Sequence, residues 1–324
     1  MKAAIFPGPG KPLVIQDIDK PTISDDEMLV RVARCGICGT DIHASREGPF
    51  MAPPNTVFGH EFAGEIVEIG SQVPDGSYSV GDRVTSLPFI GDQTIGLGEI
   101  TGAYAEFVKV APESAVRLPD ALDDANGALV EPLAVGLHAV KRAGSVAEKN
   151  ILIIGAGPIG LSCAIWCRFL GARSIVISEM SPARIDMARK LGFSDFVDPA
   201  GDVSEQFREL TSGVPEIQFE CVGQPGLLQQ CIERAPGTGT IMCIGVCDNP
   251  DTIIPLLALT KELTLRWAVA YEKEDFELTI DMMASGRIDG SAMVTHVVSL
   301  DELPEIFEAL RTPTDQCKVL IDLG

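Results

Sequence analysis

The feature that most constrains the fold is residues 151–167, a long run without a charged side chain that is interrupted by glycine. Residues 151–154 predict a strand and residues 161–170 a helix, with Gly155-Ala156-Gly157-Pro158-Ile159-Gly160 between them. The first glycine permits a tight turn, the second lets the backbone approach a pyrophosphate, and the third allows close helix packing. We therefore predict a dinucleotide site with its phosphates at a helix N-terminus. A membrane span is the alternative, but the glycines and a length below about 20 residues disfavour it.

A second strand and an acidic residue follow at the expected distance. Residues 174–178 predict the strand, and Glu179 comes directly after it, about 20 residues beyond Gly160, where a ribose-binding acid belongs. A carboxylate there accepts hydrogen bonds from the ribose hydroxyls of NAD and repels the extra phosphate of NADP. The alternative is that Arg184 or Arg189 binds a 2′-phosphate, but both lie in a predicted amphipathic, solvated helix. We predict NAD.

Potential metal ligands lie in three separate segments, at Cys38, His60-Glu61 and Glu131. A thiolate, an imidazole and carboxylates suit zinc, and a site with three or four protein groups leaves room for water or substrate. Cys38 and His60 are too far apart for a zinc finger, so the fold must bring them together. On spacing alone, a small buried hydrophobic residue is an equally good interpretation of the cysteine.

Four motifs provide the missing context: residues 38–43 (CGTDIH), 59–65 (GHEFAGE), 81–84 (GDRV) and 131–134 (EPLA). With these motifs and the glycine pattern, almost the full chain resembles the zinc-dependent medium-chain alcohol dehydrogenases, and within them the sorbitol, butanediol and threonine dehydrogenase branch. The resemblance implies an α/β fold, with a Rossmann doubly wound parallel sheet and a discontinuous GroES-like β-barrel catalytic domain. It also implies hydride transfer between a secondary alcohol, diol or polyol and NAD, giving the ketone.

The resemblance implies a catalytic zinc ion bound by Cys38 and His60. Glu61 and Glu131 are then expected to complete the coordination sphere directly or through bound water, and the choice between them stays open. Glu131 stands where many relatives have a second cysteine, which shifts the expected substrate toward vicinal or secondary alcohols. Zinc lowers the pKa of bound water from about 15.7 to about 7, so the metal carries most of the chemistry.

The catalytic residues implied by the resemblance are Cys38, His60, Thr40 and His43. Thr40 is expected to pass the alcohol proton to His43, which hands it to solvent; the alternative is that His43 only caps local structure. Asp41 is expected to orient the ring of His60, because zinc-bound histidines usually have such a partner.

Lys318 lies in residues 316–321, which resemble the last strand of the family's catalytic domain. We expect it either to reach the cofactor phosphates or to be a surface lysine at a strand start. The predicted cofactor-binding residues are Gly155, Gly157, Pro158, Ile159, Gly160, Glu179, Arg184 and Lys318.

A second, structural zinc is expected to be missing. Many relatives hold it with four cysteines after the segment 81–84, whereas this chain has no cysteine between Cys38 and Cys163, and residues 87–98 are short and glycine-rich. Cys35 precedes Cys38 in a Cys-x-x-Cys pattern, but only the second cysteine binds metal in the family. We predict a single zinc ion per chain.

The 324 residues exceed one ordinary core, so two domains are expected. We predict a catalytic domain over residues 1–132 and 270–324, and an NAD-binding domain over residues 133–269, where strands and helices alternate.

A net charge of −21 argues against nucleic acid or anionic membranes as partners, because both bind basic surfaces. A small-molecule alcohol or ketone is the expected partner. Residues 1–6 predict a strand, so we expect no signal peptide. Nine cysteines without a disulfide framework suit a reducing cytoplasm. By analogy with relatives, we expect a homodimer or homotetramer.

Two other functions stay open. A zinc-free reductase of the same superfamily would normally lack Cys38, His60 and Glu131. A non-catalytic dinucleotide-binding protein would have no need of Thr40 or His43.

Overall fold

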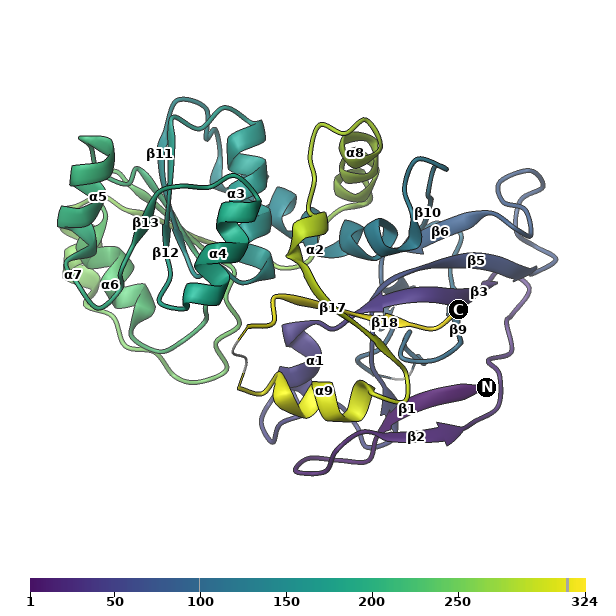
Figure 1. Ribbon diagram of the computed structural model, residues 1–324. Coiled ribbons are helices and arrows are strands. Elements are labelled where there is room, and N and C mark those ends of the chain that lie inside the picture. Colours follow the sequence, from purple (N-terminus) through teal and green to yellow (C-terminus); the bar gives the residue numbers. More distant parts are fainter. Residues whose placement is uncertain (99, 313–314) are drawn as a thin grey trace. The chain divides into compact units, whose positions relative to one another are not determined.

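The computed structural model describes residues 1–98, 100–312 and 315–324, and the chain divides into two compact units (Figure 1). Unit 1 comprises Met1–Glu131, Phe276–Ala284 and Val294–Gly324, and unit 2 comprises Pro132–Asp275 and Ser285–Met293. The chain passes from one unit to the other four times: within the helix α2 (Asp124–Ala143), within the helix α8 (Lys273–Ala284), directly after α8, and between residues 293 and 294. Pro132, inside α2, lacks the amide hydrogen that a continuous helix uses.

Unit 2 is built on a parallel sheet whose strand order is β13-β12-β11-β14-β15-β16. This order is that of the doubly wound dinucleotide-binding fold. The strands are β11 (Asn150–Ile154), β12 (Ser174–Ser178), β13 (Phe196–Val197), β14 (Ile217–Glu220), β15 (Thr240–Cys243) and β16 (Thr264–Trp267). The helices are α3 (Pro158–Phe169), α4 (Pro182–Lys190), α5 (Val203–Thr211), α6 (Leu227–Arg234) and α7 (Pro255–Thr260), with the short turn η1 (Ser291–Met293).

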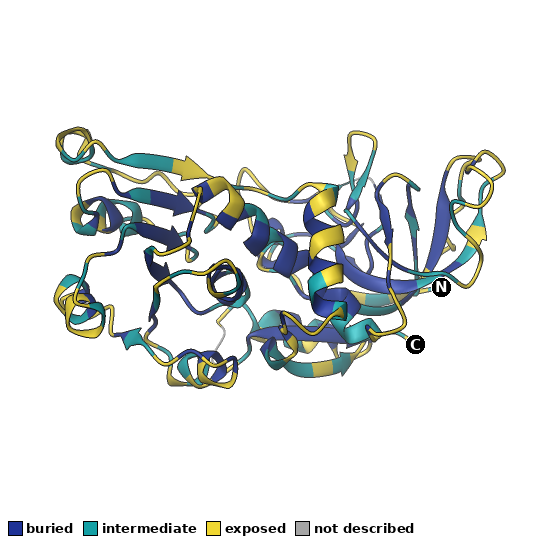
Figure 2. Cartoon of the chain, turned by 90° about the horizontal axis from the view of Figure 1, so that it is seen from above, coloured by how far each residue is buried: buried dark blue, intermediate teal, exposed yellow. Residues whose placement is uncertain are grey.

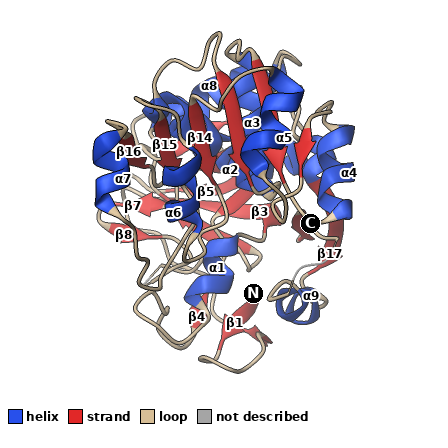
Figure 3. Cartoon of the chain, turned by 90° about the vertical axis from the view of Figure 1, so that its left-hand side faces the viewer, coloured by secondary structure: helices blue, strands red, loops and turns tan. Residues whose placement is uncertain are grey.

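Helices cover both faces of this sheet, with α3 and α4 on one side and α5, α6 and α7 on the other (Figures 1 and 3). All five residues of β11 are buried, as expected for a central strand covered on both faces. Leu152 packs in a cluster with Phe207 of α5 and Ile232 of α6. The predicted strand, turn and helix are therefore confirmed for residues 151–167. Within the described parts of the chain, no helix is long and apolar enough to cross a bilayer.

Unit 1 is built on two main sheets and a hairpin. The central strand is β3 (Met28–Gly36), which pairs with β5 (Glu61–Ile69), β9 (Phe107–Val110) and β18 (Lys318–Asp322). The same sheet contains β6 (Arg83–Ser86), β10 (Ala115–Arg117) and β17 (Val294–Ser299). The remaining elements are β1 (Lys2–Phe6), β2 (Val14–Asp17), β4 (Thr56–Val57), β7 (Phe89–Ile90), β8 (Gln93–Thr94), α1 (Gly39–Ala44) and α9 (Leu303–Ala309).

The core of unit 1 lies among these strands (Figure 2), and most residues of β1, β3 and β5 are buried. Phe58 stacks on Phe307 of α9 with ring centroids 6.1 Å apart and also contacts Phe6 of β1 at 5.2 Å. The rings therefore join α9 and the small sheet, which contains β1, into one core.

The return of the chain to unit 1 differs from the predicted position at residue 270, because residues 270–275 and 285–293 belong to unit 2. Asp275 gives the physical reason. It is fully buried, accepts a hydrogen bond from Lys141 Nζ at 2.7 Å, and lies 2.9 Å from His138 Nδ1. Likewise, η1 packs against α4.

We predict that Asp275 makes unit 2 sensitive to acid. Burial opposes its ionisation, but hydrogen bonds from Lys141, the Glu272 backbone and His138 outweigh burial and hold the pKa of Asp275 below its usual value. Such a carboxylate stabilises the fold above its unfolded-state pKa of about 3.9, and this contribution is lost as the pH falls through the folded-state pKa. Asp275→Asn should lower the free energy of unfolding by about 1.5 to 3 kcal/mol at pH 7. Denaturant titrations should show this difference shrinking below about pH 4.

The matched control is Asp186→Asn, because Asp186 pairs with Arg189 on the surface at 2.9 Å. Its effect should stay below about 1 kcal/mol at every pH. The prediction is contradicted if Asp275→Asn lowers the free energy of unfolding by the same amount at pH 2 and at pH 7.

Candidate functional site

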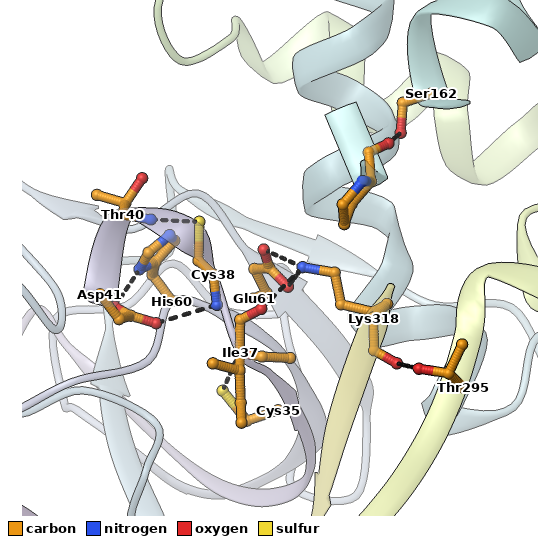
Figure 4. A network of polar contacts seen from close by, with 12 residues as sticks. Cys35, Ile37, Cys38, Thr40, Asp41, His60, Glu61, Ser162, Thr295 and Lys318 are labelled. Carbon is orange, nitrogen blue, oxygen red and sulfur yellow. Dashed lines mark hydrogen bonds and ion pairs between the residues drawn. The ribbon is translucent and has the colours of Figure 1, made fainter. Parts of the chain in front are cut away.

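Two strand ends of unit 1 bring three of the four predicted metal residues together (Figure 4). β3 ends at Gly36 and β5 begins at Glu61, and these residues are direct partners in the antiparallel pair. Cys38 follows β3 closely and His60 immediately precedes β5, so strand pairing brings together two residues that are distant in sequence. A Cβ at position 36 would lie 2.1 Å from Glu61 Oε2, so any other residue there would displace the Glu61 carboxylate.

Cys38 is the N-cap of α1. The Thr40 amide donates to Cys38 Sγ at 3.4 Å, and the Cys38 amide donates to Asp41 Oδ2 at 3.2 Å. This reciprocal pair is a capping box, in which the cap and the third helical residue satisfy each other's free amides. The local sequence thus holds Cys38 and Asp41 in place before any metal binds.

Cys38, His60 and Glu61 form what we call the ligand cluster. Among the described residues, one sulfur, one ring nitrogen and one carboxylate oxygen of these side chains lie within 4.8 Å of one another. This spacing is close to that of ligands around one zinc ion, whose bonds are about 2.0 to 2.3 Å long, and the donor types match. Burial raises the pKa of the Cys38 thiol, so a cation is needed to stabilise its thiolate. The cluster therefore fits zinc.

Asp41 faces the ring of His60, with Nδ1 3.4 Å from Asp41 Oδ1. This distance is too long for a strong hydrogen bond, and neither atom has another hydrogen-bond partner among the described residues. Burial alone would lower the pKa of His60, but the charges of Asp41 and Cys38 raise it well above its usual value. Since Nδ1 is directed at Asp41, Nε2 is the nitrogen left for a metal. A carboxylate behind a histidine is the usual arrangement at zinc sites.

Lys318 occupies neither of its two predicted positions. It is buried, and its Nζ donates to both carboxylate oxygens of Glu61 at 2.6 Å and to the Ile37 carbonyl at 3.1 Å. The physical reason is that β18 pairs with β3, which places the first residue of β18 beside the ligand cluster. Burial alone would lower the pKa of Lys318, but the charge of Glu61 raises it above its usual value. Lys318 is therefore neither a surface lysine nor free for cofactor phosphates.

The other predicted groups lie on two helices. Glu131 is buried on α2, and its charge contributes to the raised pKa of Lys318, but it is not part of the ligand cluster. Thr40 and His43 are both partly buried on α1, three residues apart and so on the same side of the helix. Cys35 is buried in β3, and burial raises the pKa of its thiol well above the usual value, as expected for an unreactive cysteine.

The glycine turn of unit 2 lies between β11 and α3. Gly155 has φ of +93°, a conformation that favours glycine, and a Cβ at Gly160 would lie 1.9 Å from the Gly155 carbonyl oxygen. Gly157 caps α3 and has open space where a Cβ would project. Pro158 and Ile159 form the first turn of the helix. The turn leaves a free helix N-terminus suited to phosphate.

Glu179 follows β12 and is tied to this turn. Its carboxylate accepts hydrogen bonds from the backbone amides of Ala156 at 2.9 Å, Met180 at 2.8 Å and Ser181 at 2.9 Å. Arg184 lies 3.8 Å from the same carboxylate. The acid is therefore fixed beside the predicted phosphate site, with a cation next to it.

Two residues beside the ligand cluster were not among the predicted site residues. Tyr104 is fully buried, and its hydroxyl donates to Asp41 Oδ2 at 2.6 Å. Gly59 has φ of +98°, and a Cβ there would lie 2.5 Å from Tyr104 Cδ1. In the sequence, Gly59 alone indicates that another part of the chain packs closely here. It does not indicate that this part is Tyr104.

Known proteins that resemble this chain in sequence or fold are dehydrogenases. A family model described as the alcohol dehydrogenase GroES-like domain matches residues 24–120, and one described as zinc-binding dehydrogenase matches residues 158–285. The (R,R)-butanediol dehydrogenase of Bacillus subtilis (strain 168) is 33% identical over 338 residues, covering 96% of each chain. The sorbitol dehydrogenase of Ovis aries is 30% identical, covering 93% of this chain and 90% of that one. A structure of a zinc-binding dehydrogenase from Sinorhizobium meliloti 1021, bound to NADP, has a TM-score of 0.90 and 31% identity, covering 99% of this chain and 98% of that one.

Proposed function

Because the chain belongs to the zinc-dependent medium-chain alcohol dehydrogenase family, we propose that it transfers a hydride from a secondary alcohol, diol or polyol to NAD and releases the ketone. The chain is an enzyme that acts on CH–OH groups and uses zinc and a nicotinamide cofactor, which sets aside the non-catalytic alternative. The observation that carries the proposal is the ligand cluster, where a cysteine from one segment meets a histidine and a carboxylate from another. A zinc-free reductase has no use for such a cluster.

The proposed zinc content is one ion per chain. Cys38 and His60 would hold it, with Glu61 as the nearest carboxylate and Glu131 as the alternative. When bound, zinc acts as a Lewis acid that lowers the pKa of an alcohol hydroxyl. The absence of cysteine from residues 87–98 supports a site count of one.

The proposed proton path runs along α1. The Thr40 hydroxyl both accepts and donates hydrogen bonds, so it can accept the alcohol proton while passing its own onward. His43 lies on the same side of α1 and is only partly buried, so its ring can deliver the proton to solvent.

NAD is proposed over NADP because Glu179 stands beside the glycine turn, where its charge opposes a 2′-phosphate. Arg184, 3.8 Å from that carboxylate, is the group that would favour NADP. The similar Sinorhizobium meliloti structure contains NADP, so both cofactors are measured in the test of the proposal.

The proposed substrate class is a vicinal diol or a polyol. The relatives named above act on butanediol and sorbitol, and Glu131 stands in place of the second cysteine of many alcohol dehydrogenases.

A homodimer or homotetramer is proposed on the basis of the edge of the parallel sheet. Among the described strands, β16 has a partner on one side only, β15. Trp267 at its end is 61% exposed, and Leu259 of the neighbouring α7 is 73% exposed. An open strand edge beside large apolar side chains suits pairing with a second copy. The nine free cysteines support a reducing, cytoplasmic location.

The test is cofactor reduction by the purified enzyme across diols, polyols, secondary alcohols and threonine, with NAD and NADP in parallel and a chelator-treated aliquot. We expect turnover of diols or polyols with NAD, loss of turnover on chelation, and recovery with about one equivalent of zinc per chain. Turnover that chelation leaves unchanged overturns the role of zinc, and faster turnover with NADP reverses the cofactor assignment.

A further inference from the structure

Tyr104 is buried beside the ligand cluster and uses its hydroxyl on a single side chain. The hydroxyl donates to Asp41 Oδ2 at 2.6 Å, and both residues are fully buried. The ring meets Phe307 edge to face, with centroids 6.4 Å apart. A phenylalanine would fill the same space, so the hydroxyl is explained by the partner that it binds and not by packing.

The two oxygens of Asp41 have different partners. Oδ2 accepts from the Tyr104 hydroxyl and from the Cys38 amide at 3.2 Å. Oδ1 faces His60 Nδ1 at 3.4 Å and has no other hydrogen-bond partner among the described residues. One oxygen is thus held by two donors, which leaves the second oxygen available to the histidine.

We propose that Tyr104 is a positioning residue for the zinc ligand His60 and acts through Asp41. By holding Oδ2, the hydroxyl fixes the rotation of the carboxylate, directs Oδ1 at Nδ1 of His60, and so keeps Nε2 turned toward the metal position. The inference rests on the proposed zinc site and adds a residue that the ligand set alone does not require. Partners behind a metal-bound histidine matter because they fix the tautomer and the ring orientation.

The experiment measures the zinc dissociation constant of the full-length protein. Zinc-loaded protein competes with a chromophoric chelator at fixed pH, for wild type, Tyr104→Phe, Asp41→Asn and the double variant. Tyr104→Phe should weaken zinc binding about tenfold and Asp41→Asn by up to about a hundredfold, the range found for groups behind metal-bound histidines. In the Asp41→Asn background, Tyr104→Phe should have no further effect, because the two act in series.

Tyr78→Phe is the matched control. Tyr78 also lies in unit 1, and its hydroxyl donates to the Ala115 carbonyl at 2.7 Å, away from the ligand cluster. This variant should bind zinc as wild type does. Substitution of cobalt for zinc gives a second readout, since the visible absorption bands should shift in Tyr104→Phe and stay unchanged in Tyr78→Phe. Circular dichroism of the metal-free proteins shows that each variant is folded.

A zinc dissociation constant of Tyr104→Phe within twofold of wild type overturns the inference. The inference also fails if Tyr78→Phe weakens zinc binding as much as Tyr104→Phe does, or if Tyr104→Phe weakens zinc binding just as much in the Asp41→Asn background. Failure of the proposed zinc site itself looks different. In that case Cys38→Ser leaves zinc binding unchanged, or the wild-type protein binds no zinc.

Discussion

Cys38→Ser should abolish alcohol oxidation while leaving NAD binding within about twofold of wild type. Serine is a good helix N-cap, so it can replace Cys38 Sγ as the acceptor of the Thr40 amide and keep α1 intact. It is a poor substitute for a thiolate as a zinc ligand. A change in the pKa of bound water from about 15.7 to about 7 corresponds to on the order of 12 kcal/mol, so turnover should fall by more than about a thousandfold. Steady-state kinetics measures turnover, metal analysis measures the zinc content, and a fluorescence titration with NADH measures cofactor binding.

Cys35→Ser is the matched control, because Cys35 lies three residues earlier, is buried, and is not part of the ligand cluster. It should retain zinc and turnover. If Cys38→Ser keeps both its zinc and its activity, the ligand assignment is wrong. If it loses NADH binding as well, the assignment of cofactor binding to unit 2 is in doubt.

The elements that could be predicted from sequence are those that local chemistry determines. The glycine turn at Gly155 and Gly160 follows from backbone sterics, and both positions have the conformation or the close contact that excludes other residues. The doubly wound sheet around β11 follows from the apolar strand that precedes that turn. Cys38 and His60 could be paired only through the family resemblance, because their meeting depends on the register of β3 with β5.

Contacts that depend on pairing between distant strands could not be predicted. Lys318 follows a polar segment and precedes an apolar one, a pattern equally typical of an exposed strand start. Its burial against Glu61 follows from the pairing of Leu320 with Gly36, more than 280 residues away along the chain. Tyr104 is similar, since an aromatic residue before a strand gives no sign that its hydroxyl reaches Asp41.

Lys318→Met should destabilise unit 1 more than any surface substitution. The side chains of Lys318 and Glu61 are 2% and 1% exposed, so removing the ammonium group leaves a buried carboxylate without its cation. Loss of one partner from a buried ion pair typically costs about 3 to 5 kcal/mol. For a unit of this size, the melting temperature should fall by roughly 6 to 20 °C. Calorimetry of chelator-treated protein measures the change without a contribution from zinc.

Two further variants separate the missing cation from a general effect of the substitution. Lys318→Met combined with Glu61→Gln should recover most of the stability, because no uncompensated charge remains in the core. Lys2→Met removes a surface pair with Asp301, whose side chains are 52% and 66% exposed, and should cost less than about 1 kcal/mol. If Lys318→Met lowers the stability no more than Lys2→Met does, another group neutralises the Glu61 charge, and the ion pair with Lys318 is not what keeps Glu61 in the core.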